Sequence, residues 1–443
     1  MIFYVIGFYL VVYGIANYKK GFFCYLIFRL FLVQNITMIS VPGVPLLTLD
    51  VFLSLFYVGL YFIRKNDLYE DKSSFPFRVP FIFLFLSWTV SAFFSIVGFG
   101  SAMSQYLRDV CQNLILIFIM WRLITSKKDF LWLFVGFNLV MLISCLYGIF
   151  EGTIQSNPLA DYEATFNSDD SKLINYDYSE DKLRGYRIKS IFEHAIGAGV
   201  MWCITIVLAL YFWIDGLIKK GKKVSILFLI LLCIICLALT KSRGPILFLI
   251  ISSLGIIQLN SKKFYYAAIF GTLLIIIGWS FFSQFGDTFL SIFSSKAQEN
   301  VGGSNADMRL EQLEASFLLM QGSPFFGLGF KYQNVIDNYL TDLLRGSESM
   351  WFSILPQFGL LGIVAYLFFA YYSIYKIPKD FHSKRLLFFS LAYWIVASLT
   401  SVPGLKMHYY FFCVLYIIKQ SKLYKYELSP PKYKQSSSVK GEE

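Results

Sequence analysis

The sequence predicts an all-α, polytopic integral membrane protein with about 12–13 transmembrane helices and a large extracytoplasmic loop that contains an amphipathic helix. Of the 443 residues, 57% are hydrophobic and 15% are charged, and the mean hydropathy is +0.59. Soluble domains contain about 45–50% apolar and about 25% charged residues. The composition therefore favours a chain whose surroundings are largely lipid.

Thirteen apolar runs are candidates for spanning helices, because a bilayer core requires about 20 mainly apolar residues. The first, ninth and last are short, which leaves a count of twelve open. The first run lacks a basic leading segment and a small-residue cleavage site, so we expect a first membrane helix and not a removed signal peptide. In order, the runs cover residues 2–16, 22–39, 44–63, 79–97, 108–124, 129–150, 191–214, 224–240, 245–258, 264–285, 351–375, 386–402 and 405–418.

The distribution of basic residues predicts the orientation of the chain. If the N-terminus lies outside, the inward loops and the C-terminal tail hold 24 basic and 9 acidic residues, whereas the outward segments hold 13 basic and 19 acidic ones. Basic residues concentrate in cytoplasmic loops. The net charge of +11 is then a consequence of topology, and we expect no nucleic-acid partner.

These boundaries divide the chain into six segments. They are N-terminal transmembrane helices (1–150), an extracytoplasmic loop (151–190), central transmembrane helices (191–285), a large extracytoplasmic loop (286–350), C-terminal transmembrane helices (351–420) and a disordered cytoplasmic tail (421–443).

A helical pattern lies in the large loop, beginning after Ser304 and Asn305 and ending at Gly322. The pattern predicts an amphipathic helix at the outer membrane surface. Its apolar side is expected to hold Met308, Leu313, Phe317 and Met320, and its polar side Glu311, Gln312 and Glu314.

No metal or cofactor is predicted. The seven cysteines lie in or beside apolar runs, and even the closely spaced Cys233 and Cys236 fall within an uncharged helix without a second ligand pair. We therefore expect buried, small apolar residues. The chain contains neither the phosphate-binding GxxxxGK[ST] pattern nor the zinc-binding HExxH pattern.

The stretch from Ala238 to Phe248 joins two apolar runs and carries Lys241 and Arg243 beside Gly244-Pro245. Glycine and proline suit a reverse turn, because one relaxes and the other fixes the backbone angles. The turn does not require the two basic residues. Other charged side chains are expected at the same outer level, namely Arg187, Glu193, His194, Arg309 and Glu348.

This combination suits an anionic ligand and a hydroxylated one. A guanidinium binds phosphate oxygens with two parallel hydrogen bonds and stays charged, and a neighbouring carboxylate can accept a proton from a hydroxyl. A lipid-linked phosphate or pyrophosphate and a hydroxylated acceptor would fit such a site.

Simpler roles exist for each residue. Lys241 and Arg243 can extend to the lipid headgroups, and Arg309 can pair with nearby acidic residues. His194 can be a hydrogen-bonded structural residue, and Glu348 can stabilise a helix start. For Arg29 and Arg122, which fall within helices, we expect side chains that extend from the helix ends to the interface.

Four motifs follow one another over residues 187–375. They are Arg187 with SIFEHAIGAG (190–199), the joint TKSRGP (240–245), Arg309 with GSPFFGLG (322–329), and Glu348-Ser349 with GLLG (359–362). In this order around an outer loop, they resemble the O-antigen ligase and O-antigen polymerase superfamily of bacterial membrane glycosyltransferases. The joint is the most specific motif, and the first 150 residues are similar only in being helical.

The resemblance implies that Arg243 and Arg309 bind the pyrophosphate of an undecaprenyl-linked glycan without a metal, with Lys241 or Arg187 assisting. It also implies a bacterial cytoplasmic membrane location, an outward-facing site, membrane lipid as a partner, and a chain-length regulator and a flippase as protein partners. Ligases of the family have a histidine, taken as the residue that activates the acceptor, where this chain has Glu348. The 286–350 loop has no histidine.

This difference favours a polymerase of lipid-linked repeat units in which Glu348 activates the acceptor. A ligase that transfers the glycan to a lipid A core or to protein remains an alternative. A flippase for lipid-linked sugars is a third, although it would be expected to show repeated halves and helices broken near the midplane.

Overall fold

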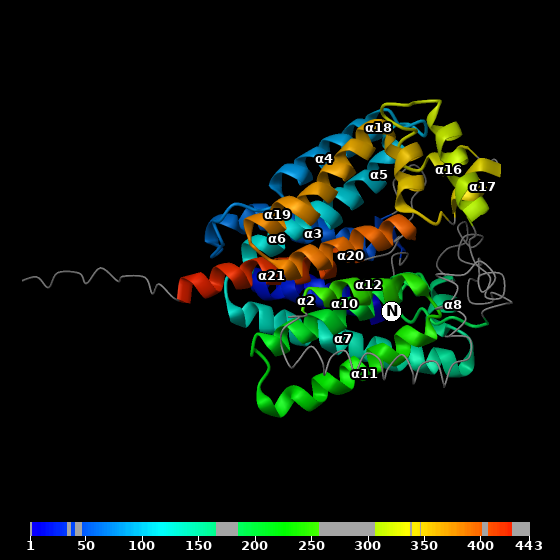
Figure 1. The fold of residues 1–443 in the computed structure, drawn as a ribbon. Helices are drawn as coiled ribbons and strands as arrows, with labels where there is room; N and C mark the ends of the chain where they lie inside the picture. Colours follow the sequence, from blue (N-terminus) through cyan, green and yellow to red (C-terminus); the bar gives the residue numbers. More distant parts are fainter. Residues whose placement is uncertain are drawn as a thin grey trace, which may run out of the picture.

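The computed structural model describes residues 2–32, 37–39, 47–164, 185–256, 306–336, 339–345, 347–400 and 406–427. They form a bundle of helices lying side by side, and one two-stranded ribbon is the only β-sheet within these ranges (Figure 1). Four stretches are long and apolar enough to span a membrane, judged by length and composition: Lys127–Ile154, Ala195–Ile214, Lys220–Leu239 and Met350–Asp380. The prediction of an all-α, polytopic membrane protein is confirmed.

The N-terminal half consists of helices that pack side by side. A π-helical turn (Val110–Ile115) joins α5 and α6 into one continuous rod. The elements are α1 (Ile2–Ala16), α2 (Tyr18–Phe28), β1 (Thr37–Ile39), β2 (Leu47–Thr48), α3 (Leu49–Arg64), α4 (Arg78–Phe93), α5 (Phe99–Asp109), α6 (Leu116–Leu123), α7 (Lys127–Ile154) and α8 (Pro158–Ala164).

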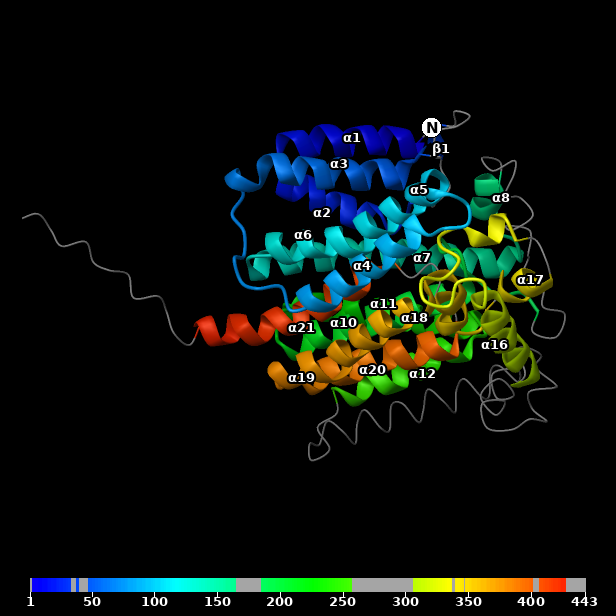
Figure 2. The same ribbon diagram turned by 90° about the horizontal axis from the view of Figure 1, so that it is seen from above.

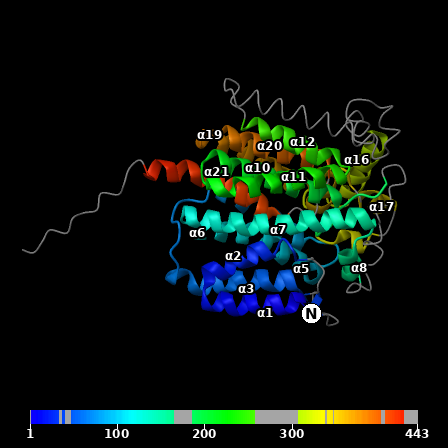
Figure 3. The same cartoon turned by 90° about the horizontal axis from the view of Figure 1, so that it is seen from below.

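The C-terminal half packs against the other side of α7. In Figure 3, α7 separates α1–α3 from α10, α11, α12 and α20, and α12 packs along α20 and α10. The elements are α10 (Ala195–Ile214), α11 (Lys223–Leu239), α12 (Arg243–Leu254), α16 (Ala306–Met320), α17 (Tyr339–Arg345), α18 (Met350–Tyr371), α19 (Ile377–Asp380), α20 (Lys384–Leu399) and α21 (Met407–Glu427).

The two ends of the bundle differ. Helices α8, α16 and α17 lie together at one end, which we call the loop end, and α21 leaves the bundle at the opposite end, which we call the tail end (Figure 2). Ion pairs at the tail end join helices to one another and to the connecting segments. They are Lys19–Asp129 (2.8 Å), Arg385–Asp215 (2.8 Å) and Lys419–Asp71 (2.9 Å).

Most predicted spans coincide with helices, but several boundaries differ. The run 22–39 ends as a helix at Phe28, and the run 108–124 begins earlier, at Phe99. Helix α21 continues to Glu427, beyond the predicted start of the tail at residue 421. The predicted span 264–285 and the N-cap candidates Ser304 and Asn305 lie outside the described residues.

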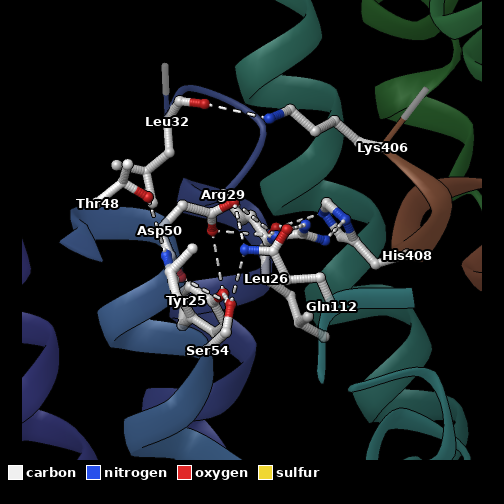
Figure 4. A network of polar contacts seen from close by, with 11 residues as sticks. Tyr25, Leu26, Arg29, Leu32, Thr48, Asp50, Ser54, Gln112, Lys406 and His408 are labelled. Atoms are coloured by element: carbon white, nitrogen blue, oxygen red, sulfur yellow. Dashed lines mark hydrogen bonds and ion pairs between the residues drawn. The ribbon is translucent and has the colours of Figure 1, made fainter. Parts of the chain in front are cut away.

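A buried polar network connects α2, α3, the π-helical turn and α21 near the loop end (Figure 4). Nε of Arg29 lies 3.1 Å from Oδ1 of Asp50, and both side chains are under 5% exposed. The same guanidinium donates to Oε1 of Gln112 (2.7 Å) and contacts Nδ1 of His408 (3.0 Å). The expectation that Arg29 extends to the interface is wrong, because a buried charge needs polar partners and finds them inside the bundle.

Arg122, the second arginine within a helix, also differs from the expectation. Its Nη1 donates to the backbone carbonyl of Asp71 at 2.7 Å and its guanidinium lies over the ring of Phe118. The side chain therefore holds the 65–77 connection against α6.

Helix α16 docks on α17 and α18 through a partly polar side. Gln312, Ala315, Ser316 and Leu319 are buried, whereas the apolar residues Met308, Leu310, Phe317 and Leu318 are exposed. The predicted polar side is therefore wrong at Gln312, because this amide finds its partners within the loop-end packing: it donates to the carbonyl of Leu343 and accepts from the backbone N–H of Glu348.

Candidate active site

The joint between α11 and α12 is fixed by Arg187. Nε of Arg187 donates to the carbonyl of Thr240 (3.0 Å), and Nη2 donates to Oγ of Ser242 (2.6 Å). Lys241, between these two residues, adopts the left-handed region with φ = 49°. Such a conformation costs energy in a residue other than glycine, and it persists only where the surroundings impose it.

Glu151 at the end of α7 positions the segment that carries Arg187. Its fully buried carboxylate accepts hydrogen bonds from the backbone N–H groups of Lys189 (3.1 Å) and Ser190 (2.6 Å) and from the hydroxyl of Tyr186 (3.1 Å). The residue was not singled out from the sequence, because one glutamate at a helix end carries no pattern.

Gly244 and Pro245 do not form the turn, which corrects the expectation for the joint. Both belong to the first turn of α12, where proline is tolerated because the first N–H groups of a helix lack partners within it. Instead, Gly244 and Pro245 allow close packing of α12 against its neighbours. A Cβ at Gly244 would lie 3.1 Å from Cγ2 of Thr400, and one at Gly199 would lie 2.6 Å from Cγ of Pro245.

Arg309 contacts the C-terminal end of α20, and the helix that Arg243 begins starts beside the same end. Arg243 begins α12, next to the Gly244–Thr400 contact. From α16, Nη2 of Arg309 donates to the carbonyl of Leu399 at 3.1 Å. The terminal carbonyls of a helix carry partial negative charge and attract cations.

Glu348 completes this group. Its Oε2 lies 3.9 Å from Nη2 of Arg309, with side chains 28% and 38% exposed. Its backbone N–H donates to Oε1 of the buried Gln312 (3.0 Å), which ties the start of α18 to α16. An ion pair this exposed contributes only about 0.2–1 kcal/mol to stability. The pair is therefore not needed for the fold.

Two of the glycine motifs meet at a break in α18. Gly359 has φ = 60°, and the backbone of 324–329 runs alongside the unwound turn. Leu328 and Gly329 donate N–H groups to the carbonyls of Pro356 and Gln357, while Leu360 and Leu361 donate to those of Pro324 and Phe325. A Cβ at Gly327 would lie 2.4 Å from a backbone oxygen, so only glycine fits. The backbone groups released by the break in α18 are therefore hydrogen-bonded to residues 324–329, as buried backbone groups require.

A cavity of about 510 Å³ opens between α4, α5, α18, α20 and α21. Its lining includes Glu193, Gln333 and Ser347 from loop-end segments. A polar face of α5 and the π-helical turn forms one wall, with Gln105, Arg108, Asp109, Gln112 and Asn113. Ser347 directly precedes Glu348, so the cavity adjoins the Arg309–Glu348 pair.

His194 is placed as a helix cap. Its Nδ1 accepts the N–H of Ile196 at 3.1 Å, at the start of α10. Burial, together with the charges of Arg187 and Lys189, lowers the pKa of His194 to about 4, so the imidazole is neutral at pH 7. Glu193 instead is exposed and lies at the cavity wall.

Burial and the neighbouring Arg187 affect the pKa of Lys241 in the joint. Burial, and then the charge of Arg187, lowers the pKa of the Lys241 ammonium below its usual value. A bound anion would oppose both effects. Within the described ranges, no three His, Cys, Asp or Glu side chains lie together as metal ligands.

The fold and these contacts define a polytopic membrane protein whose loop end gathers arginine and carboxylate side chains beside a cavity. Residues 228–367 match the family model described as O-antigen ligase (Wzy_C), and this match supports the O-antigen ligase and polymerase superfamily for that part of the chain. The resemblance seen in the sequence motifs is confirmed. No curated protein matches the chain in the corresponding comparison.

The matched region holds the joint, Arg309, Glu348 and the break in α18, whereas Arg187, Glu193 and His194 lie outside it. Members of this family are membrane enzymes of the glycosyltransferase type, and the family implies a lipid-linked glycan as substrate. The match supports a function of the O-antigen ligase or polymerase type.

Proposed function

We propose that the protein is a polymerase that joins undecaprenyl-pyrophosphate-linked oligosaccharide repeat units into a surface polysaccharide on the outer face of the bacterial cytoplasmic membrane. The observation that carries the proposal is the Arg309–Glu348 pair beside the end of α20, with Arg243 at the adjoining start of α12. Cationic groups suited to a pyrophosphate thus lie next to a carboxylate suited to receive a proton.

In the proposed reaction, the donor pyrophosphate binds to Arg243 and Arg309, with Lys241 nearby. Glu348 accepts the proton of an acceptor hydroxyl, whose oxygen forms a bond to the anomeric carbon of the donor. The bond between this carbon and the pyrophosphate oxygen breaks, and undecaprenyl pyrophosphate leaves with its charge stabilised by the arginines. The reaction as proposed uses no metal, and Arg187 acts by holding the joint.

A ligase is the second candidate, and the description of the matching family favours it. Glu348 in place of the histidine of the family's ligases supports the polymerase. A flippase has less support, because the backbone groups freed at the break in α18 are taken by residues 324–329 and are not available to a transported ligand.

Deletion of the gene, followed by electrophoresis of the surface polysaccharide, separates the three functions. Loss of a polymerase should leave single repeat units attached at the surface. Loss of a ligase should leave long polymer on the lipid carrier, and loss of a flippase should leave single units on the inner face. Either of the last two patterns would overturn the polymerase proposal.

A further inference from the structure

The rod formed by α5 and α6 carries an unusual polar face for a segment inside a membrane bundle. Gln105 is followed by two adjacent pairs, Arg108-Asp109 and Gln112-Asn113, at the i+3/i+4 spacing of one helix face, and all five residues line the cavity. Polar and ionisable residues within membrane helices are costly, and they normally face a bundle interior or a water-filled cavity with a function. The π-helical turn begins directly after Asp109, and such turns are frequent at functional sites.

Arg108 and Asp109 are only loosely paired. Nε of Arg108 lies 3.6 Å from Oδ1 of Asp109, and the side chains are 34% and 25% exposed. The two groups attract each other without a short hydrogen bond between these atoms. Both therefore retain capacity for a ligand in the cavity.

The rest of the cavity lining is rich in aromatic side chains. Trp88, Phe358, Tyr366, Tyr393 and Trp394 contribute to it, and the hydroxyls of Ser347 and Ser353 lie among them. A pocket of about 300–1,000 Å³ with apolar walls and a few polar groups is typical of small-ligand sites. Sugars match this lining, because their hydroxyls both donate and accept hydrogen bonds while their C–H faces pack on flat rings.

The charges of the lining are nearly balanced, which argues against an anionic ligand. Arg29 is paired with Asp50, and Arg108 lies beside Asp109. Lys406 donates to the carbonyl of Leu32, and Glu193 adds one carboxylate. A polyprenyl chain fits no better, because it would cover Arg108 and Asp109 without any hydrogen bond.

We propose that this cavity binds the acceptor saccharide, with Arg108, Asp109 and Asn113 bonding to its hydroxyls and one hydroxyl directed past Ser347 toward Glu348. The identification of the bound sugar as the acceptor rests on the proposed polymerase function. The binding site itself does not, because it requires only a saccharide without lipid or phosphate. Arg108, Asp109 and Asn113 lie outside the matched family domain, whereas Ser347 and Ser353 lie within it. The proposal therefore assigns a recognition role to part of the N-terminal half.

The test uses the full-length protein in detergent micelles and the free saccharide released by mild acid from the lipid-linked units of a gene-deletion strain. Saturation-transfer NMR and tryptophan fluorescence report its binding. Asp109→Asn should weaken binding by roughly tenfold or more, since a hydrogen bond to a charged group is lost. Asn113→Ala should weaken it less, and Ser353→Trp should abolish it by filling the cavity. Ser101→Ala, on the exposed side of the same helix, is the matched control.

Thermal unfolding of each variant checks that the fold is intact, and Asn113→Ala keeps the test valid if Asp109→Asn does not fold. Wild-type affinity in both Asn113→Ala and Ser353→Trp would overturn the saccharide site. Protection of a cavity cysteine at Ser353 by polyprenyl phosphate, but not by the saccharide, would also overturn it. Saccharide binding that depends on Asp109 in a protein without transferase activity would support the site and refute the polymerase proposal instead.

Discussion

Nη2 of Arg309 lies 3.1 Å from the carbonyl oxygen of Leu399, so a side chain of α16 bonds to the last carbonyl of α20. The same nitrogen lies 3.9 Å from Oε2 of Glu348. One guanidinium therefore links three loop-end elements, α16, the start of α18 and the end of α20. A change at Arg309 or Glu348 acts on the charge of this junction more than on the stability of the fold.

Glu348→Gln should reduce turnover by about 100-fold or more, because the amide keeps the shape of the side chain but cannot accept the proton. Donor binding should change little, since both arginines remain. Glu348→Asp should retain part of the rate. Elongation of purified lipid-linked repeat units by the reconstituted enzyme measures this effect. A wild-type rate in Glu348→Gln would remove the assignment of Glu348 as the base.

Arg243→Lys should lose most activity while the protein still inserts and accumulates normally. A guanidinium makes two parallel bonds to phosphate oxygens, whereas an ammonium acts as a point charge. If Arg243 only reached the headgroups, lysine would serve nearly as well. The length distribution of the polysaccharide at matched protein levels is the measurement, and a normal distribution would support the headgroup role. Lys222→Arg at the other end of α11 is a suitable control.

A single cysteine at Ser156 should react with a membrane-impermeant thiol reagent added to intact cells, and one at Gly221 should not. Both positions are exposed, and they lie at opposite ends of the bundle, after α7 and before α11. The distribution of basic residues predicts that the loop end faces outward. In a cysteine-free background, the reverse labelling would place the candidate site in the cytoplasm and exclude the proposed reaction.

Asp50→Asn should destabilise the protein strongly, because it leaves the buried guanidinium of Arg29 without its counter-charge. Breaking a buried pair costs about 3–5 kcal/mol. Asp380→Asn breaks the exposed Lys376–Asp380 pair, with side chains 46% and 48% exposed, and should have almost no effect. Thermal unfolding in detergent measures both, and equal shifts would contradict the structural role of the network.

His194 should make stability depend on pH. Its folded-state pKa of about 4 lies below the usual value of 6.5, so the unfolded chain binds the proton more readily. Stability is then fully present above about pH 6.5 and falls as the pH drops toward 4. His194→Asn keeps a side chain that can cap α10 and should flatten this part of the profile of melting temperature against pH. An unchanged slope in the variant would assign the effect to other groups.

The fold class and the superfamily could be predicted because they depend on features that a single sequence displays, namely long apolar runs and short motifs in a fixed order. The junction of Arg309 with Glu348 was anticipated only as a common depth in the membrane. Their contact depends on Gln312, whose burial reverses the polar side expected for α16. Tertiary packing determines that Gln312 is buried, whereas helical periodicity alone places it on the exposed polar side.

The polar face of α5 was missed for a different reason. The predicted span began at residue 108 and thereby placed Arg108 and Asp109 at a helix end, where charge is ordinary. The helix begins at Phe99, and the spacing from Gln105 to Asn113 then identifies a continuous face. Arg29, Asp50 and His408 could not be linked from the sequence, because they are isolated polar residues separated by up to 379 positions.

The unwound turn at Gly359 has a consequence for engineering. Four backbone hydrogen bonds join residues 324–329 to residues 356–361, so each segment supplies the backbone partners of the other. Each segment therefore depends on the other for its backbone structure. A chimera that imports the outer loop of a related enzyme to change product specificity should exchange both segments together, since a graft of either alone would pair mismatched backbones and fail to assemble.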